Sequence, residues 1–335
     1  MHEIRFCKKD EYKLLQEFIK KYWKEDHIFV KSKEILDFQH FDKKNQRYNF
    51  LVAFNKQNKE FDAVLGFILQ SQYDINAKDI NIWTSLWSAK KEFPSLGLRL
   101  YKSLQEFFSL KNTASSGMSE FSLKFVRLFN YHKIGKLYHF YIKNDKRKYF
   151  KIAYFKDIKT ISHRKSSLKL KLLSCNEFKN YELKSNFYPK KSKDYFIYRY
   201  FKHPIYKYKA YGVFKDDKIL SIFFTRIIKQ NKSKCMLIVD FLGKFQKNLY
   251  DEFQKLLQKQ NLEFVSFLCY VWDTNKIIQM GFSLKNEESI IPVYFEPFLK
   301  ENIDIYFAFK SEYKNYTIFK GDSDQDRPNI YINSV

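Results

Sequence analysis

The sequence predicts an α+β protein made of two domains in tandem, each with a mixed, mostly antiparallel, twisted sheet flanked by helices. Three observations lead to this prediction. Short apolar runs typical of strands alternate with segments in which apolar residues recur every three to four positions, as in helices. The order of these segments in the first 145 residues returns, more loosely, between residues 168 and 300. The chain has 335 residues, of which 45% are hydrophobic, enough for two domains with apolar cores.

In the first half, the expected elements follow the order β, α, α, β, β, β, α, β, α, β. Leu15, Phe18 and Ile19 lie at helical spacing, and Leu100 and Leu104 belong to a similar stripe. Apolar runs bounded by polar turns predict the strands. We expect strands at residues 2–7, 48–55, 62–73, 79–89, 113–117 and 136–144, and helices at residues 8–25, 31–41, 94–108 and 119–132.

The second half follows the same plan. Asp216 and Asp217 separate two apolar runs, which predicts a hairpin. Residues 145–169 are charged and weakly periodic, which predicts a connection between domains. We therefore expect a first domain at 1–145, a connection at 146–167 and a second domain at 168–335 that ends in a polar tail. The expected strands are 169–175, 208–217, 218–228, 234–243, 262–272 and 290–298, and the mostly helical segments are 176–206, 245–261 and 273–281.

The formal net charge is +24, from 61 Lys and Arg against 37 Asp and Glu. Such a charge favours a polyanionic partner: nucleic acid, an anionic membrane surface or a phosphorylated substrate. The lysines are dispersed, however, and the chain is rich in Lys, Phe, Tyr, Ile and Asn but has only 8 Gly, as AT-rich coding would produce. We prefer compositional bias as the explanation. Nucleic acid and peripheral membrane contact stay open as partners, and a basic surface still favours an anionic ligand such as a nucleotide.

Several protein classes are not expected. No uninterrupted apolar run approaches the ~20 residues that span a bilayer, and the charged N-terminus lacks an apolar signal region. These features predict a cytoplasmic protein. The four cysteines show neither CxxC nor Cys/His ligand spacing, which predicts reduced thiols and no metal site. The sequence also lacks GxSxG, Walker A and Rossmann motifs.

The segment "PSLGLRL" begins at Pro94, directly after the strand expected at 79–89. With this order of elements, it resembles the Gln/Arg-x-x-Gly-x-Gly/Ala loop of the GNAT acyltransferases. In that family the pyrophosphate of acyl-CoA sits at a helix N-terminus, where unpaired amides and the helix dipole attract an anion. Gly97 matches the last position. Ser95 replaces the first glycine, and Glu92 replaces the Gln or Arg and would repel phosphate.

The resemblance implies a site for acetyl-CoA or another acyl-CoA as co-substrate, without a metal. The amides of residues 96–100 would hold the thioester, Arg99 would add a charged contact, and the strand backbone near Trp87 and Ser88 would pair with the pantetheine. The implied cofactor-binding residues are Trp87, Ser88, Ser95, Leu96, Gly97, Leu98, Arg99 and Leu100.

A second resemblance lies in "NYHKIGKL". It is similar to the family's Tyr-x-x-x-Gly-Phe, with Tyr131 at the tyrosine, Gly135 at the glycine and Lys136 in place of the phenylalanine. The resemblance implies that Tyr131 protonates the departing thiolate, a role that suits a phenol because it is protonated at neutral pH. The second half keeps a Gly-Phe turn at Gly281 and Phe282. It therefore resembles a degenerate copy that shapes the substrate cleft.

Candidates for a base and for substrate binding come from several segments. Asp240 is bracketed by apolar residues on the strand expected at 234–243; burial would raise its pKa and suit it to base chemistry, or it caps the following loop. Gln39 and His40 lie in the region that forms the substrate wall in the family. Further histidine candidates are His27, His132 and His139.

The tail "KGDSDQDRPN" carries Asp322, Asp324 and Asp326 at alternating positions in a very basic protein. One interpretation is a polar loop that folds back on the basic surface. The other is that Asp324 binds the ammonium or hydroxyl groups of a substrate.

These observations favour an acyl-CoA-dependent N-acyltransferase, acting on an amino sugar in nucleotide- or glycan-linked form, as in the tandem GNAT-like enzymes of surface-polysaccharide and sugar-nucleotide pathways. The amine would attack the thioester directly. Two alternatives stay open. One is a FemABX-like aminoacyltransferase that uses aminoacyl-tRNA, for which the positive charge would hold the tRNA. The other is a non-catalytic, GNAT-shaped binding module whose cofactor loop has decayed.

Overall fold

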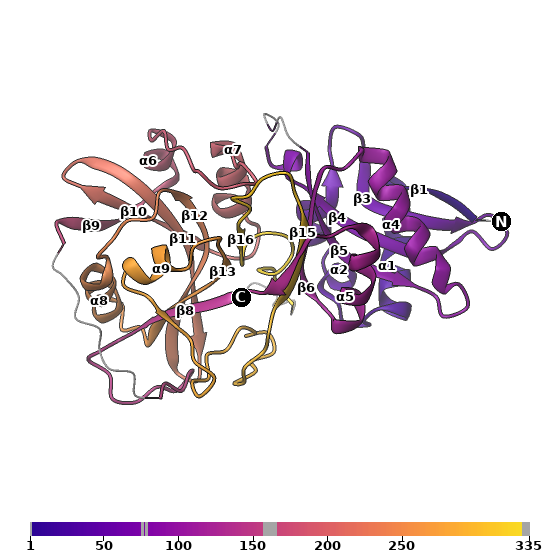
Figure 1. The fold of residues 1–335 in the computed structure, drawn as a ribbon. Coiled ribbons are helices and arrows are strands. Elements are labelled where there is room, and N and C mark those ends of the chain that lie inside the picture. Colours follow the sequence, from indigo (N-terminus) through magenta and orange to yellow (C-terminus); the bar gives the residue numbers. More distant parts are fainter. Residues whose placement is uncertain (1, 75–76, 78–79, 157–165, 330–335) are drawn as a thin grey trace.

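The computed structural model describes residues 2–74, 77, 80–156 and 166–329, and these residues form two sheets that lie side by side with helices around them (Figure 1). Both sheets are mixed and mostly antiparallel, which confirms the predicted α+β class. The expected connection at 146–167 lies partly outside the described residues, as do the beginning of the strand expected at 79–89 and the end of the tail.

Sheet A contains most of the first half, on the right of Figure 1. Its strand order is β1-β3-β4-β5-β6-β15-β7, and β2 pairs with β3. The strands are β1 (His2–Lys8), β2 (Phe41–Asp42), β3 (Arg47–Asn55), β4 (Glu60–Leu69), β5 (Asn81–Ala89), β6 (Asn112–Met118), β7 (Lys133–Lys136) and β15 (Tyr306–Lys310).

Sheet B contains most of the second half. Its order is β14-β8-β13-β12-β11-β10-β9, and β16 pairs with β13. The strands are β8 (Tyr138–Lys143), β9 (Leu168–Leu173), β10 (Tyr208–Lys215), β11 (Lys218–Gln230), β12 (Ser233–Gly243), β13 (Phe264–Tyr270), β14 (Ser283–Leu284) and β16 (Ile318–Phe319).

The helices flank both sheets and connect the strands (Figure 1). Serine side chains cap the N-termini of α3, α5, α6 and α7 by accepting a hydrogen bond from a first-turn amide, which explains where these helices begin. The α-helices are α1 (Tyr12–Tyr22), α2 (Ile28–Lys31), α3 (Lys33–His40), α4 (Pro94–Phe108), α5 (Glu120–Val126), α6 (Cys175–Lys179), α7 (Lys193–Phe196), α8 (Tyr250–Lys259) and α9 (Asn275–Gln279). Single turns of 3₁₀-helix lie at Lys9–Glu11, Gln70–Gln72 and Arg127–Phe129, and a π-helical turn lies at Ile197–Phe201.

Among the described strands, each sheet has one parallel pair, built in the same way. In sheet A, β5 and β6 are parallel and α4 connects them; in sheet B, β12 and β13 are parallel and α8 connects them. A parallel neighbour requires such a crossover, whereas the other pairs are antiparallel. The two β-α-β units are therefore the equivalent parts of the two halves.

The halves exchange one strand each. In sheet A, β15 from the end of the chain lies between β6 and β7, and in sheet B, β8 lies between β13 and β14. Figure 1 shows β8 in magenta extending into the second half and the late strand β15 beside β6. The division at residues 145 and 168 stays a prediction, and the exchange shows that these numbers do not separate the two sheets.

Three expectations need correction. Residues 290–298 form only isolated bridges, and the late strand is β15 instead. The helical segment expected at 176–206 forms α6, α7 and a π-helical turn with irregular chain between them. The strand expected at 136–144 is divided into β7 and β8, because the chain leaves sheet A at Leu137 and enters sheet B.

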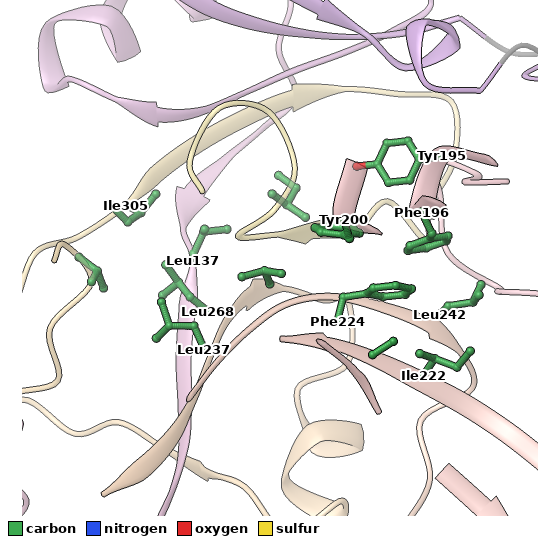
Figure 2. Packing of buried hydrophobic residues seen from close by; sticks show 14 of the residues in the cluster. Leu137, Tyr195, Phe196, Tyr200, Ile222, Phe224, Leu237, Leu242, Leu268 and Ile305 are labelled. Atoms are coloured by element: carbon green, nitrogen blue, oxygen red, sulfur yellow. The ribbon is translucent and has the colours of Figure 1, made fainter. Parts of the chain in front are cut away.

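The largest core group lies between the two sheets and includes residues from both halves. Figure 2 shows part of it, with Leu237 and Leu268 of sheet B near Leu137 and Ile305, and Phe224 beneath Tyr200. The rings of Tyr200 and Phe224 are stacked, with their centroids 4.9 Å apart and an angle of 25° between their planes. This shared apolar core fixes how the second half lies against the first.

Candidate active site

Strands β5 and β6 separate part of the way along their length. Their parallel pairing runs from Asn81 opposite Asn112 to Thr84 opposite Ser115. Beyond this point β5 continues along β4 and β6 continues along β15, so the two strands diverge. At the closed end, Ser115 Oγ donates to the Thr84 carbonyl at 3.3 Å. The divergence leaves a V-shaped split in sheet A.

A β-bulge shapes the β5 side of the split. Ser85 and Leu86 together lie opposite the single residue Gly66 of β4. Gly66 leaves room for this arrangement, because a Cβ there would lie 2.8 Å from Ser85 Oγ and 2.7 Å from the Phe50 ring. Ser85 Oγ is buried and has no hydrogen-bond partner among the described residues. The bulge therefore leaves a buried hydroxyl group without a partner in the wall of the split.

A cavity of about 330 Å³ occupies the split. Its walls come from elements on both faces of sheet A and from the end of the chain. Residues from the α4–α5 face are Trp87, Tyr101, Ser122 and Val126; those from the α1–α2 side and the later part of the chain are Trp23, His27, Tyr294, Asp324, Gln325, Arg327 and Asn329. The strands contribute Ser85, Ser115, Ser116 and neighbouring residues. The second half thus contributes directly to a cavity in the first.

The N-terminus of α4 does not line this cavity but contacts Trp87, which does. Its N-cap, Phe93, makes no side-chain capping bond, and Pro94 occupies the first helical position. The Leu96 amide donates to the Phe93 carbonyl at 3.1 Å. Amides from Leu98 onward lie inside the helix, where each has an acceptor four residues earlier. Of the expected amides 96–100, those of 98–100 are therefore unsuitable for an anion, and the exposed first turn at Ser95 remains the best candidate.

Gly97 does not face open space. The Trp87 indole Nε1 donates to the Gly97 carbonyl at 2.9 Å, and a Cβ on Gly97 would lie 3.1 Å from that nitrogen. The sequence interpretation placed this glycine against a pyrophosphate; in the structure it makes room for a tryptophan ring. Ser88 pairs with β4, and its hydroxyl donates to the Tyr22 carbonyl at 3.2 Å. Arg99 is exposed on α4.

Tyr131 lies behind the cavity wall. Its hydroxyl contacts the Tyr101 hydroxyl and lies 3.2 Å from Thr113 Oγ1. Burial raises the pKa of both phenols, that of Tyr101 well above its ordinary value, so both stay protonated. Tyr101 lines the cavity and Tyr131 does not. The sequence analysis missed Tyr101, although it lies one turn after Gly97 on the same helix face.

Asp240 lies in sheet B and not at the cavity. Its carboxylate is fully buried in sheet B, 2.8 Å from Lys191 Nζ, and accepts a hydrogen bond from the Tyr200 hydroxyl at 2.7 Å. Burial raises the pKa of Asp240 despite the Lys191 ammonium. The residue does not line the cavity. Its surroundings are those of a buried ion pair.

Gln39 and His40, the residues expected to contact the substrate, do not reach the cavity. Gln39 and His40 are buried, and neither lines it. His40 lies between the Phe29 and Phe50 rings, and its Nδ1 is 3.0 Å from the Phe67 carbonyl; burial lowers its pKa to about 4.

His27, one of the further histidine candidates, does line the cavity. Its Nε2 lies 3.0 Å from the Arg327 guanidinium, and burial together with that charge lowers the pKa of His27 to about 2. This imidazole is therefore neutral at physiological pH.

Two further findings concern the described residues. They contain no group of three or more His, Cys, Asp or Glu side chains that could hold a metal ion. Within the same part of the chain, no helix has the length and apolar character needed to cross a membrane.

Comparisons with known proteins give a structural match. No protein-family model and no curated protein matches the chain. A GCN5-related N-acetyltransferase from Anabaena variabilis ATCC 29413 is similar in structure, with a TM-score of 0.57 and 11% identity over 92% of this chain and 72% of that one. A conserved protein of unknown function from Enterococcus faecalis V583, described as a probable N-acyltransferase, has a TM-score of 0.54 and 9% identity over 93% and 73%. The chain therefore has a GNAT-like α+β fold.

Proposed function

We propose that the chain is an acyl-CoA-dependent N-acyltransferase whose acceptor is an amino sugar or a similar amine in glycan or nucleotide-sugar biosynthesis, in the cytoplasm. The observation that carries the proposal is the cavity in the β5–β6 split, which joins the α4 side of sheet A to the side where Asp324 lies. Such a passage allows a thioester and an amine to approach each other from opposite faces. The GNAT-like fold supports acyl transfer as the reaction class.

The residues around the cavity suit both substrates. The uncapped first turn of α4 at Ser95 would bind the pyrophosphate of acyl-CoA, with Arg99 on the same helix adding positive charge. The amine nitrogen, after losing a proton to water, would form a bond to the thioester carbonyl carbon, and the C–S bond would break. The thiolate would take a proton from a phenol, and the second proton that leaves the nitrogen would return to the phenolate through water. Tyr101 is the phenol in the cavity wall, and Tyr131 stands behind it in hydroxyl contact.

A second candidate function has an observation in its favour. Trp87 fills the space between β5 and Gly97, and Glu92 lies exposed beside the α4 N-terminus. Both features oppose a bound pyrophosphate and pantetheine. A non-catalytic binding module would retain the split and the amine-binding side without using acyl-CoA.

Titration calorimetry with acetyl-CoA tests the donor site. Ser95→Asp places a carboxylate in the first turn of α4, where it repels phosphate but favours the helix dipole, so that folding is preserved. Ser103→Asp adds the same charge two turns further along α4 and serves as the control. We expect micromolar binding by the wild type and the control, and a loss of at least tenfold in Ser95→Asp. Absence of binding by the wild type up to millimolar acetyl-CoA would reject the acetyltransferase and favour the binding module.

A further inference from the structure

The last described segment, residues 318–329, runs from sheet B to the cavity in sheet A, and we name it the C-terminal strap. It begins as β16, in which Phe319 pairs with Cys269 of β13. The Gly321 amide then donates to the Val239 carbonyl of β12 at 2.7 Å. At its far end, Gln325 Nε2 donates to the Ser116 carbonyl of β6 at 3.1 Å. The strap thus connects the two β-α-β units.

Two of its three aspartates are fully paired. Asp322 lies 2.6 Å from Lys191 Nζ, and its second oxygen accepts from the Phe319 amide at 2.9 Å. Asp326 accepts from Arg226 at 2.7 and 3.2 Å and from the Tyr208 hydroxyl at 2.7 Å. Both carboxylates are buried. These contacts fix the strap on either side of Asp324.

Asp324 is different. Ser323 has a φ of 58°, in the left-handed region, which turns the strap between Asp322 and Asp324. The contacts of Asp324 are all long: Gln325 Nε2 at 3.3 Å, Ser323 Oγ at 3.4 Å and Arg327 Nε at 3.5 Å. Its side chain is 14% exposed and lines the cavity. A mostly buried carboxylate with only long contacts is costly to leave without a strong partner.

A second, independent observation points to a ligand in the same place. Ser116 is buried, lines the cavity, and its Oγ has no hydrogen-bond partner among the described residues. Ser85 on the opposite strand is half-buried, and its Oγ also has no hydrogen-bond partner among the described residues. Native structures rarely leave buried hydroxyls unpaired without a reason. The aromatic rings of Trp23 and Tyr294 complete this part of the wall.

The geometry points to Asp324 as the residue that binds the ammonium group of the acceptor, with Ser85 and Ser116 as hydrogen-bond partners of its hydroxyl groups. The ligand class is a hydroxylated primary amine such as an amino sugar. This inference rests on the proposed function, because it names the acceptor side of the same cavity. It also assigns the second half a role: sheet B and its ion pairs hold the strap so that Asp324 reaches a cavity formed mainly by sheet A.

Amine binding without acyl-CoA tests the inference directly. Asp324→Asn keeps the shape of the side chain but removes its charge, and its long contacts predict a folded variant. Glucosamine is the probe, and glucose, which has a hydroxyl in place of the ammonium, is the matched ligand. Asp217→Asn, in the exposed β10–β11 turn, is the control for charge. Ser116→Ala is the second variant, and urea unfolding checks that every variant is folded.

We expect wild type and Asp217→Asn to bind glucosamine more tightly than glucose, and Asp324→Asn to lose at least tenfold in glucosamine affinity without a change for glucose, the size typical of a charged hydrogen bond. Ser116→Ala should weaken both sugars several-fold. Equal glucosamine affinity in wild type and Asp324→Asn, or no glucosamine binding by wild type at 10 mM, overturns the inference. If glucosamine binding depends on Asp324 but acetyl-CoA does not bind, the amine site is retained and acyl-CoA is rejected as the donor. If acetyl-CoA binds but glucosamine binding does not depend on Asp324, only the donor site is retained.

Discussion

The β5–α4–β6 unit of the first half and the β12–α8–β13 unit of the second have the same plan but different contents. Both parallel pairs end early, at Thr84 opposite Ser115 in sheet A and at Ile238 opposite Phe267 in sheet B. The first split contains a cavity. In the second, β16 pairs with β13, and Gly321 bonds to β12, so the space is filled by the chain itself.

The polar groups differ in the same way. In the filled split, Lys191 lies between the Asp240 and Asp322 carboxylates and pairs with both. In the open split, the hydroxyls of Ser85 and Ser116 have no partner among the described residues. The comparison teaches that one architecture serves two purposes: a split whose polar groups are saturated stabilises the fold, and a split whose polar groups are free is available for a ligand.

Replacement of Lys191 should have the largest effect on stability. Lys191→Met leaves two buried carboxylates without a cation, which we expect to lower the free energy of unfolding by about 3–5 kcal/mol. Urea unfolding at pH 7 measures this loss. Burial raises the pKa of Asp240, and loss of the Lys191 ammonium removes the charge that opposes this rise, so part of the stability should return as the pH falls toward 5.

Lys190→Met is the matched control, because Lys190 is an exposed neighbour of Lys191. It should change the free energy of unfolding by less than about 0.5 kcal/mol. Equal effects of the two substitutions would contradict the assignment of Lys191 to a buried ion pair.

Lys320, which follows β16 in the strap, should make the free energy of unfolding depend on pH. Burial lowers its pKa to about 8, against 10.5 for an ordinary lysine. The unfolded chain therefore binds more protons between pH 8 and 10.5, and this group's contribution makes the folded state more stable as the pH rises through that window, by up to about 3 kcal/mol. Urea unfolding at pH 8, 9 and 10 measures how the free energy of unfolding changes with pH. In Lys320→Met this change should be smaller, because the contribution of the lysine is absent. An unchanged slope in the variant would show that Lys320 is not responsible.

Gly321 tests how tightly the strap approaches β12. A Cβ there would lie 2.7 Å from the Val239 carbonyl and 2.3 Å from the Tyr200 hydroxyl. We expect Gly321→Ala to cost about 1–3 kcal/mol, because a backbone atom cannot move away cheaply. Gly135→Ala is the comparison: its Cβ would meet only the Phe307 ring, at 3.1 Å, so the loss should be smaller. Thermal unfolding of both variants measures the two losses of stability. A larger loss for Gly135→Ala than for Gly321→Ala would refute the close approach of the strap to β12.

Local features of the fold could be predicted from the sequence, and long-range pairings could not. The apolar spacing around Leu100 and Leu104 placed α4 correctly. The strand at Tyr306–Lys310 was missed because its partners, β6 and β7, lie about 170 to 200 residues earlier in the chain. The segment at 290–298 has strand-like composition but forms only isolated bridges.

The same limit applies to the site. Of the residues that sequence reasoning proposed, Asp324 and His27 line the cavity, and α4 begins where it was expected, but their roles stay predictions. It missed Ser85 and Tyr101, whose places in the cavity wall depend on a bulge in β5 and on packing against Tyr131. Gly97 lies in the first turn of α4 as expected, but it contacts Trp87 and not the expected pyrophosphate position. The orientation of the Trp87 ring depends on tertiary packing, which the sequence pattern does not show.

The exchange of β8 and β15 has a consequence for biosynthesis. As the chain leaves the ribosome from its N-terminus, β6 and β7 emerge long before β15, and until then the edge of β6 that will receive it has no strand partner. An unpaired edge invites association with other chains. We therefore expect nascent chains that stop before residue 306 to bind chaperones or aggregate, and the ligand cavity to form only after nearly the whole protein has been synthesised.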